Sequence, residues 1–267
     1  MRKISFAAVM LAACVSVASA DFLSVSAGAG FWRENISGSL KKDSSTNYFG
    51  KHDVNPSANE GALGLEDKTQ PYFWVKFIHP VPFIPNVKFQ YTKYDSTGHS
   101  DYVAGNVKIG DVTINTALTN VDSSMRIDSY DFTFFYELKP VVVDLEAGFG
   151  FDYWDAHTTL TGTETTTGIR KTIVDDDWKL ILPYLYGHAE TMQFYGFSAI
   201  GNLKWLKVGD YHHYDYSVAL KYTIDIVGPV NPFIKAGYRY KEIYGKDDGT
   251  EVELKYDGAF LEIGAKF

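Results

Sequence analysis

One short segment of the chain combines acidic and imidazole side chains at a spacing that suits hydrolysis. Asp210, His212, His213 and Asp215 follow one another closely. An imidazole beside a carboxylate can act as a general base. Alternation along a strand places His212 on the face of Tyr214, away from His213 and Asp215. The sequence offers no convincing second acidic pair opposite this segment.

Two acidic runs offer oxygen ligands of the type that divalent cations prefer. They are Asp175-Asp176-Asp177 and Asp247-Asp248, and both are expected in solvated loops. They could hold a divalent cation weakly, or bridge lipopolysaccharide phosphates through one, but we interpret them as solvated acidic residues of exposed loops. We predict no metal site and no cofactor. The net charge of −8 leaves no basic stripe for phosphates, so nucleic acid is not expected as a partner.

A larger set of charged residues alternates with apolar residues along the chain. If the segments close into a barrel, these charges line its inside, where an unpaired charge is costly. The pattern fits either a salt-bridge plug or the lining of a narrow aqueous path. The predicted lumen-facing network is Asp144, Glu146, Asp152, Asp215, Lys221, Lys235, Arg239, Lys241, Glu262 and Lys266.

The elements that position these residues are predicted to be about ten β-strands, because the dominant period after Asp21 is two. Pro183 falls inside the sixth strand, where it predicts a bulge or a local break. The strands are expected over residues 22–33, 72–78, 87–92, 130–137, 141–153, 178–190, 197–205, 213–222, 234–241 and 259–267.

Three features favour a transmembrane barrel over a soluble sandwich. One face of nearly every segment is apolar or aromatic, and the charges lie on the other. Long polar gaps at residues 35–69, 96–123 and 155–177 alternate with short turns, as extracellular loops alternate with periplasmic turns in outer-membrane barrels. The first gap has room for extra short strands or a helical turn at residues 62–67. The chain also ends on Phe267, an aromatic residue of the type that the barrel assembly machinery reads.

The five tryptophans lie near the ends of the predicted strands. We interpret them as aromatic residues at the membrane interface, which are expected in this class of protein. A sugar-binding platform is the alternative. The residues are Trp32, Trp74, Trp154, Trp178 and Trp205.

The N-terminus predicts export. Arg2 and Lys3 precede an apolar stretch, and Ala18-Ser19-Ala20 forms a small-residue cleavage site, as in a signal peptide. Residues 1–20 are therefore predicted to be removed, and residues 21–267 to form one barrel domain. Leu11-Ala12-Ala13-Cys14 also matches a lipoprotein cleavage box, which leaves lipidation of Cys14 open.

Two blocks of sequence resemble a known family. The first, within residues 74–87, contains the proline turn HPVPFIPN; the second is LPYLYGHAE at residues 182–190. With the terminal Phe267, they resemble proteobacterial outer-membrane β-barrel proteins of unassigned function. The resemblance spans the mature chain, and it implies a fold and a location without supplying catalytic residues.

We therefore expect an all-β, antiparallel up-and-down barrel, monomeric and without enzymatic activity, in the outer membrane of a Gram-negative envelope. Its expected partners are outer-membrane lipid, lipopolysaccharide and the assembly machinery. The expected role is structural or narrow passive permeation. The alternatives are a porin-like channel for ions or small solutes, an adhesin that binds through its loops, and a rim protease of the omptin type, whose Asp-x-His spacing Asp210 and His212 match.

Overall fold

The computed structural model describes residues 23–81, 83–109, 112–138, 143–225, 229–247 and 249–267. The predicted signal peptide and Cys14 lie outside these residues. No helix in the described part of the chain is long and apolar enough to cross a membrane. The elements in chain order are β1 (Ser24–Lys42), β2 (Ser45–Gly50), the 3-10 turn η1 (Pro56–Ala58), β3 (Glu60–Leu65), β4 (Lys68–Ile78), β5 (Asn86–Val103), β6 (Val107–Ile109), β7 (Val112–Ile114), β8 (Leu118–Leu138), β9 (Val143–Glu164), β10 (Arg170–Thr191), β11 (Phe197–Val208), β12 (Tyr211–Thr223), β13 (Asn231–Asp247) and β14 (Thr250–Lys266).

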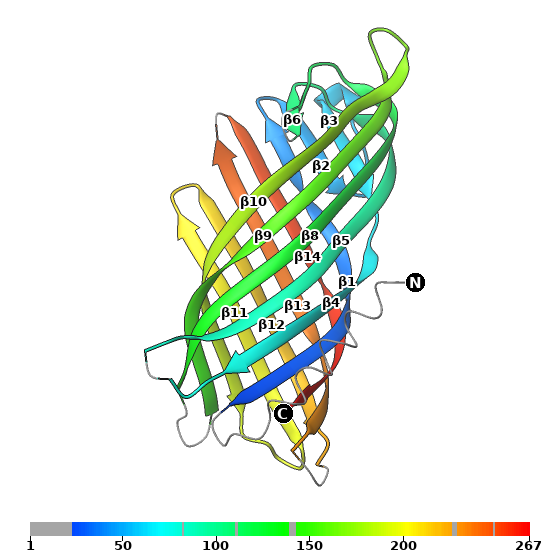
Figure 1. Ribbon diagram of the computed structural model, residues 1–267. Helices are drawn as coiled ribbons and strands as arrows, with labels where there is room; N and C mark the ends of the chain where they lie inside the picture. The colour runs from blue at the N-terminus through cyan, green and yellow to red at the C-terminus, as the bar shows by residue number, and fades with distance from the viewer. Residues whose placement is uncertain (1–22, 82, 110–111, 139–142, 226–228, 248) are drawn as a thin grey trace.

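Strands from both ends of the chain close the sheet into a barrel (Figure 1). The ring runs β1–β4–β5–β8–β9–β10–β11–β12–β13–β14, and β14 pairs back with β1, each pair antiparallel. Beyond the end of β4, the short strands β2 and β3 take its place between β1 and β5. The predicted antiparallel barrel of about ten strands is confirmed.

The segments predicted as long loops are mostly strand. Residues 35–42 continue β1, residues 96–103 continue β5, and β9 and β10 run to a turn at residues 165–169. Of the two alternatives for residues 35–69, the extra short strands are the one present, as β2 and β3; residues 60–65 form β3 and not a helical turn. In Figure 1 the long strands β8, β9 and β10 rise well above the hairpin of β11 and β12.

Pro183 does not break its strand. It pairs with Phe151 of β9 in a continuous register, and the irregularity in β10 lies between Thr172 and Val174 instead. The pairing of β10 with β11 extends only to Leu185. Pro183 therefore lies just past the last paired residue, where a missing N–H donor costs no ladder bond to β11.

The outside of the barrel carries a band without charge. Its upper limit is a row of charged or histidine side chains, and below this row the outward positions hold aromatic, aliphatic, Gly or Pro residues on all ten strands. The row is Arg33, Lys93, Asp128, Asp155, Lys179, Lys207, His212, Glu242 and Asp257. We call this band the apolar belt; it comprises the outward side chains of residues 25–31, 71–77, 87–91, 130–138, 143–153, 181–189, 197–205, 214–222, 232–240 and 259–265.

The inside of the barrel has two zones. Above the row of charges, in a part that we call the protruding half, buried aliphatic and aromatic side chains fill the space between the walls, and the hairpin of β6 and β7 packs into them. Among them are Ile36, Leu40, Leu63, Val107, Ile114, Leu118, Ile127, Leu160, Val174, Ile243 and Leu254. Inside the belt, by contrast, most inward side chains are polar or charged. The candidate site is this polar zone.

Candidate functional site in the barrel interior

Ion pairs connect the walls of the polar zone. Three of them cross the lumen, because their partners lie on strands that are not neighbours: Lys76 of β4 with Glu146 of β9, Lys204 of β11 with Asp131 of β8, and Lys241 of β13 with Asp152 of β9. All six side chains are largely or completely buried. Such pairs fix the spacing of opposite walls, since separating them would leave buried charges unpaired.

Three further pairs join nearer strands. Arg239 of β13 forms two hydrogen bonds with the Asp215 carboxylate of β12, at 2.9 and 2.6 Å. This fork-to-fork geometry is among the strongest for a charged pair. Lys235 Nζ lies 2.7 Å from the Glu262 carboxylate, and Lys221 pairs with Glu190.

Tyrosine hydroxyls donate hydrogen bonds to three of these carboxylates. Tyr72 donates to Glu262 at 2.8 Å, Tyr184 to Asp131 at 2.7 Å and Tyr186 to Glu146 at 3.1 Å. The large rings fit because glycines face them across the sheet. A Cβ at Gly150 would lie 2.5 Å from the Tyr184 hydroxyl, so a larger residue there would displace Tyr184 from Asp131.

Four of the five tryptophans are inside the barrel, so their interpretation as membrane-interface residues is wrong for Trp32, Trp74, Trp154 and Trp178. Trp32 and Trp154 are fully buried and Trp74 is buried, while Trp178 packs against the buried core and donates to Thr158. The physical reason is strand parity: each shares a face with the inward residues, and its neighbours in sequence point outward. Trp205 alone faces outward within the belt, 43% exposed.

These buried rings separate the polar zone from the core of the protruding half. Trp32, Tyr94, Trp154 and Tyr256 pack against one another, with centroid distances of 4.9 to 6.5 Å. We call these four residues the aromatic layer. Arg239 lies 4.5 Å from the Trp32 ring, and Lys241 lies 4.7 Å from Trp154, distances at which cations are attracted to aromatic faces. The polar zone is therefore capped by rings and then by an apolar core.

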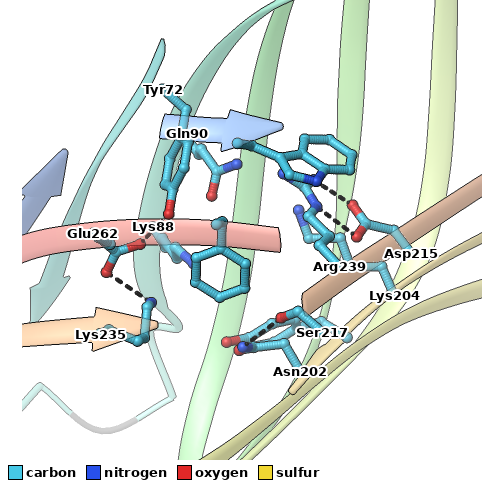
Figure 2. A pocket seen from close by; sticks show the side chains of 13 residues that line it. Tyr72, Lys88, Gln90, Asn202, Lys204, Asp215, Ser217, Lys235, Arg239 and Glu262 are labelled. Carbon is cyan, nitrogen blue, oxygen red and sulfur yellow. Dashed lines mark hydrogen bonds and ion pairs between the residues drawn. The ribbon is translucent and has the colours of Figure 1, made fainter. Parts of the chain in front are cut away.

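Two cavities remain in the polar zone. The smaller, about 50 Å³, is lined by residues that include Lys88, Lys204, Lys235, Arg239, Asp215 and Glu262. Figure 2 shows Lys88, Lys235 and Glu262 on one side of it and Arg239 with Asp215 on the other. The larger, about 410 Å³, extends from Lys88 and Lys235 toward the end of the barrel where Lys266 lies. We call this larger cavity the vestibule.

The structure places the ten residues of the predicted network as follows. Glu146, Asp152, Asp215, Lys221, Lys235, Arg239, Lys241 and Glu262 lie in the ion pairs given above. Asp144 and Lys266 line the vestibule. Sequence reasoning missed four of the partners, although each lies on an inward face that alternation identifies: Lys76, Asp131, Glu190 and Lys204.

The histidine cluster does not form a hydrolytic pair between Asp210 and His212. The Nε2 of His212 contacts the Glu242 carboxylate at 3.1 Å, and its ring stacks between Tyr214 and Tyr244 on the outside of the barrel. His213 is fully buried and faces inward, with an edge contact to Tyr184.

The acidic run at residues 175–177 lies in β10 and not in a loop. His157 of β9 contacts both Asp177, at 2.8 Å, and Asp175, at 3.4 Å. The second run falls at Asp247 and Asp248, and Asp248 is outside the described residues. At the chain end, Phe267 and Val25 exchange two backbone hydrogen bonds, so the terminal residue extends the pairing of β14 with β1.

Comparisons with known proteins yield structural likenesses only. No protein-family model matches the chain, and no curated protein sequence does. The attachment invasion locus protein Ail of Yersinia pestis, solved with the heparin analogue sucrose octasulfate, is 11% identical over 92% of this chain and 99% of its own, with a TM-score of 0.34. The outer membrane protease OmpT from Escherichia coli is 10% identical over 94% and 99% of the two chains, also with a TM-score of 0.34. Neisserial surface protein A is 12% identical over 91% and 95%, with a TM-score of 0.26. At these TM-scores, none of the three bears on what this chain does.

Proposed function

We propose that this chain is an integral outer-membrane protein whose closed barrel serves envelope structure and holds the protruding half outside the membrane, without catalysis. The observation that carries the proposal is the apolar belt. Lipid-facing charges are costly near the bilayer midplane, by about 2–4 kcal/mol for Lys or Arg. A tilted strand needs about 9–11 residues to cross the hydrocarbon layer, and the belt segments at residues 143–153 and 181–189 match that length.

The contents of the barrel favour a closed scaffold over a channel. The cross-lumen pair of Lys204 with Asp131 spans the polar zone, and the pair of Lys241 with Asp152 spans its upper end, against the Trp154 ring. The aromatic layer and the apolar core then fill the protruding half. An ion that entered the vestibule would have to cross these buried rings, and dehydration in an apolar constriction opposes that passage.

The proposal is tested by reconstitution. The mature chain is folded into phosphatidylcholine vesicles, and the vesicles are washed with alkaline carbonate and digested with trypsin from outside. We expect the folded chain to stay with the vesicles and to lose no belt segment. Release by carbonate, or a chain that stays folded and soluble without lipid or detergent, would contradict a membrane location.

The protruding half supports a second candidate function, the binding of a surface partner. The three segments expected to be loops are instead mostly strand, and extensions of β1, β5, β8, β9 and β10 build the wall of this half, with residues 165–169 at the turn between β9 and β10. A rigid, strand-built surface outside the membrane suits adhesion better than mobile loops do. Replacement of residues 165–169 by a Gly-Ser turn should abolish attachment of whole cells to host cells if this function holds, while surface expression stays normal.

A further inference from the structure

Two lysines meet at the inner end of the vestibule with one carboxylate between them. Lys88 of β5 and Lys235 of β13 both lie over the ring of Trp74, with Nζ at 5.3 and 5.7 Å from its centroid. Both line the small cavity and the vestibule, so they stand where the two spaces meet. Figure 2 shows them on the same side of the small cavity as Glu262.

The carboxylate of Glu262 already has two partners. It pairs with Lys235 at 2.7 Å and accepts the Tyr72 hydroxyl at 2.8 Å. The neighbouring lysine, Lys204, pairs with Asp131. Within the described residues, Lys88 forms neither a hydrogen bond nor an ion pair: its ammonium group lies over the Trp74 ring, and Glu262 and Asp131, which have other partners, attract it only at longer range. The inner end of the vestibule therefore has one ammonium group more than it has carboxylates to balance.

An unbalanced ammonium inside a barrel is unfavourable unless a counter-charge reaches it. The vestibule gives such a counter-charge both room and a route, because its volume is about 410 Å³ and it continues from Lys88 to the rim. Lys76 and Lys221, the register partners of Lys88 and Lys235 on the neighbouring strands, are neutralised by Glu146 and Glu190. The mouth of the vestibule is lined by Glu137, Asp144, Asp225 and Lys266. Attraction for an anion is thus concentrated at Lys88 and not at the mouth.

We propose that the inner end of the vestibule binds a small oxyanion, such as phosphate or a carboxylate, with Lys88 as its ion-pair partner. Lys235 adds attraction at longer range while it keeps Glu262. The barrel wall surrounds the site on all sides except the vestibule, so a free ion fits it better than the headgroup of a lipid whose acyl chains must stay outside. This inference concerns the lumen alone and does not depend on the proposed function.

The test uses inorganic phosphate as the probe and the full-length mature chain in a nonionic detergent. Isothermal titration and the phosphate-dependent rise in melting temperature are measured at constant ionic strength for the native chain, Lys88→Met, Lys88→Arg and Lys179→Met. The last removes an exposed, outward lysine of β10 and is the matched control.

We expect Lys88→Met to weaken phosphate binding at least tenfold and to remove the rise in melting temperature. Lys88→Arg and Lys179→Met should retain both. Because Lys88→Met removes an unbalanced charge, it should fold and melt at or above the native temperature in phosphate-free buffer. The site is refuted if the native chain binds phosphate no better than Lys88→Met does. A Lys88 side chain that is uncharged in the lumen would give this same result.

Native mass spectrometry checks the source of the oxyanion. A lipid-sized adduct that is present on the native chain and absent from Lys88→Met would overturn the assignment to a free ion.

Discussion

The ammonium group of Lys241 on β13 meets the carboxylate of Asp152 on β9 across the lumen, directly below the ring of Trp154. Asp152 also accepts hydrogen bonds from Ser129 at 2.6 Å and from the Trp154 indole at 2.8 Å. One carboxylate therefore ties together three strands of the wall and the lower face of the aromatic layer. This is the point at which the polar zone ends and the apolar core begins.

Removing one member of this pair should destabilise the barrel strongly. In Lys241→Met the Asp152 charge stays buried without its cation, and such losses typically amount to about 3–5 kcal/mol. Asp152→Asn should lower the stability by a similar amount, because it leaves the buried Lys241 ammonium group without its counter-charge. The double variant should lose less than the sum of the two, which a thermal-unfolding cycle followed by gel mobility measures. Simple additivity would mean that the two groups do not interact.

The two tryptophans Trp154 and Trp205 should report opposite sides of the wall. Brominated lipids quench indole rings that contact acyl chains, and only Trp205 faces outward in the belt. Trp205→Phe should therefore remove most of the quenching, whereas Trp154→Phe should leave it in place. The stability ranking should be reversed, since Trp154→Ala opens a buried cavity, with an expected loss of about 3–5 kcal/mol. Equal quenching losses in the two Phe variants would contradict the assignment of faces.

A charge placed on the belt should impair insertion. Val218 points outward from the middle of β12 and is 64% exposed. Val218→Lys should cost about 2–4 kcal/mol of insertion free energy and reduce the folded fraction in vesicles. The matched variant Thr172→Lys adds the same charge to an exposed position of β10 in the protruding half, and it should fold like the native chain. If both variants insert equally well, the belt is not a lipid-facing surface.

Glu34, buried in the protruding half just above the belt, should make stability depend on pH. Burial raises its pKa well above the usual value, although Arg239 and Lys241 act in the opposite direction. A raised folded-state pKa means that the protonated form is favoured on folding. The contribution of Glu34 is thus most favourable below its unfolded pKa of about 4.3 and declines as pH rises toward the folded value. Glu34→Gln should remove this decline and raise the melting temperature at pH 7. The prediction fails if the pH profiles of the two proteins are parallel.

The outside of the barrel was predictable from the sequence because successive side chains of a regular strand point to opposite faces. Phe149, Phe151 and Tyr153 identify one face, and Glu146 and Asp152 the other, from a single segment. The same rule, applied to Trp32 and Trp154, would have placed them inside; position near a strand end was the weaker guide.

The pairing across the lumen could not be predicted in the same way. Lys204 reaches Asp131, and Lys76 reaches Glu146, only because ring closure and strand tilt bring non-neighbouring strands to the same height. Those quantities depend on the register of all ten pairs at once. The strand extensions above the belt were also missed, because polar residues such as Thr161 and Thr172 suit loops and the exposed face of a strand equally well.

The most direct test of the account is a single-channel recording of the folded native chain in a planar bilayer, with insertion verified by protease protection in the same lipid. We expect no discrete conductance steps, because ion pairs, the aromatic layer and the apolar core of the protruding half close the barrel. Reproducible steps whose ion selectivity changes on Asp152→Asn or Arg239→Ala would contradict it, and the protein would then be a channel lined by those residues.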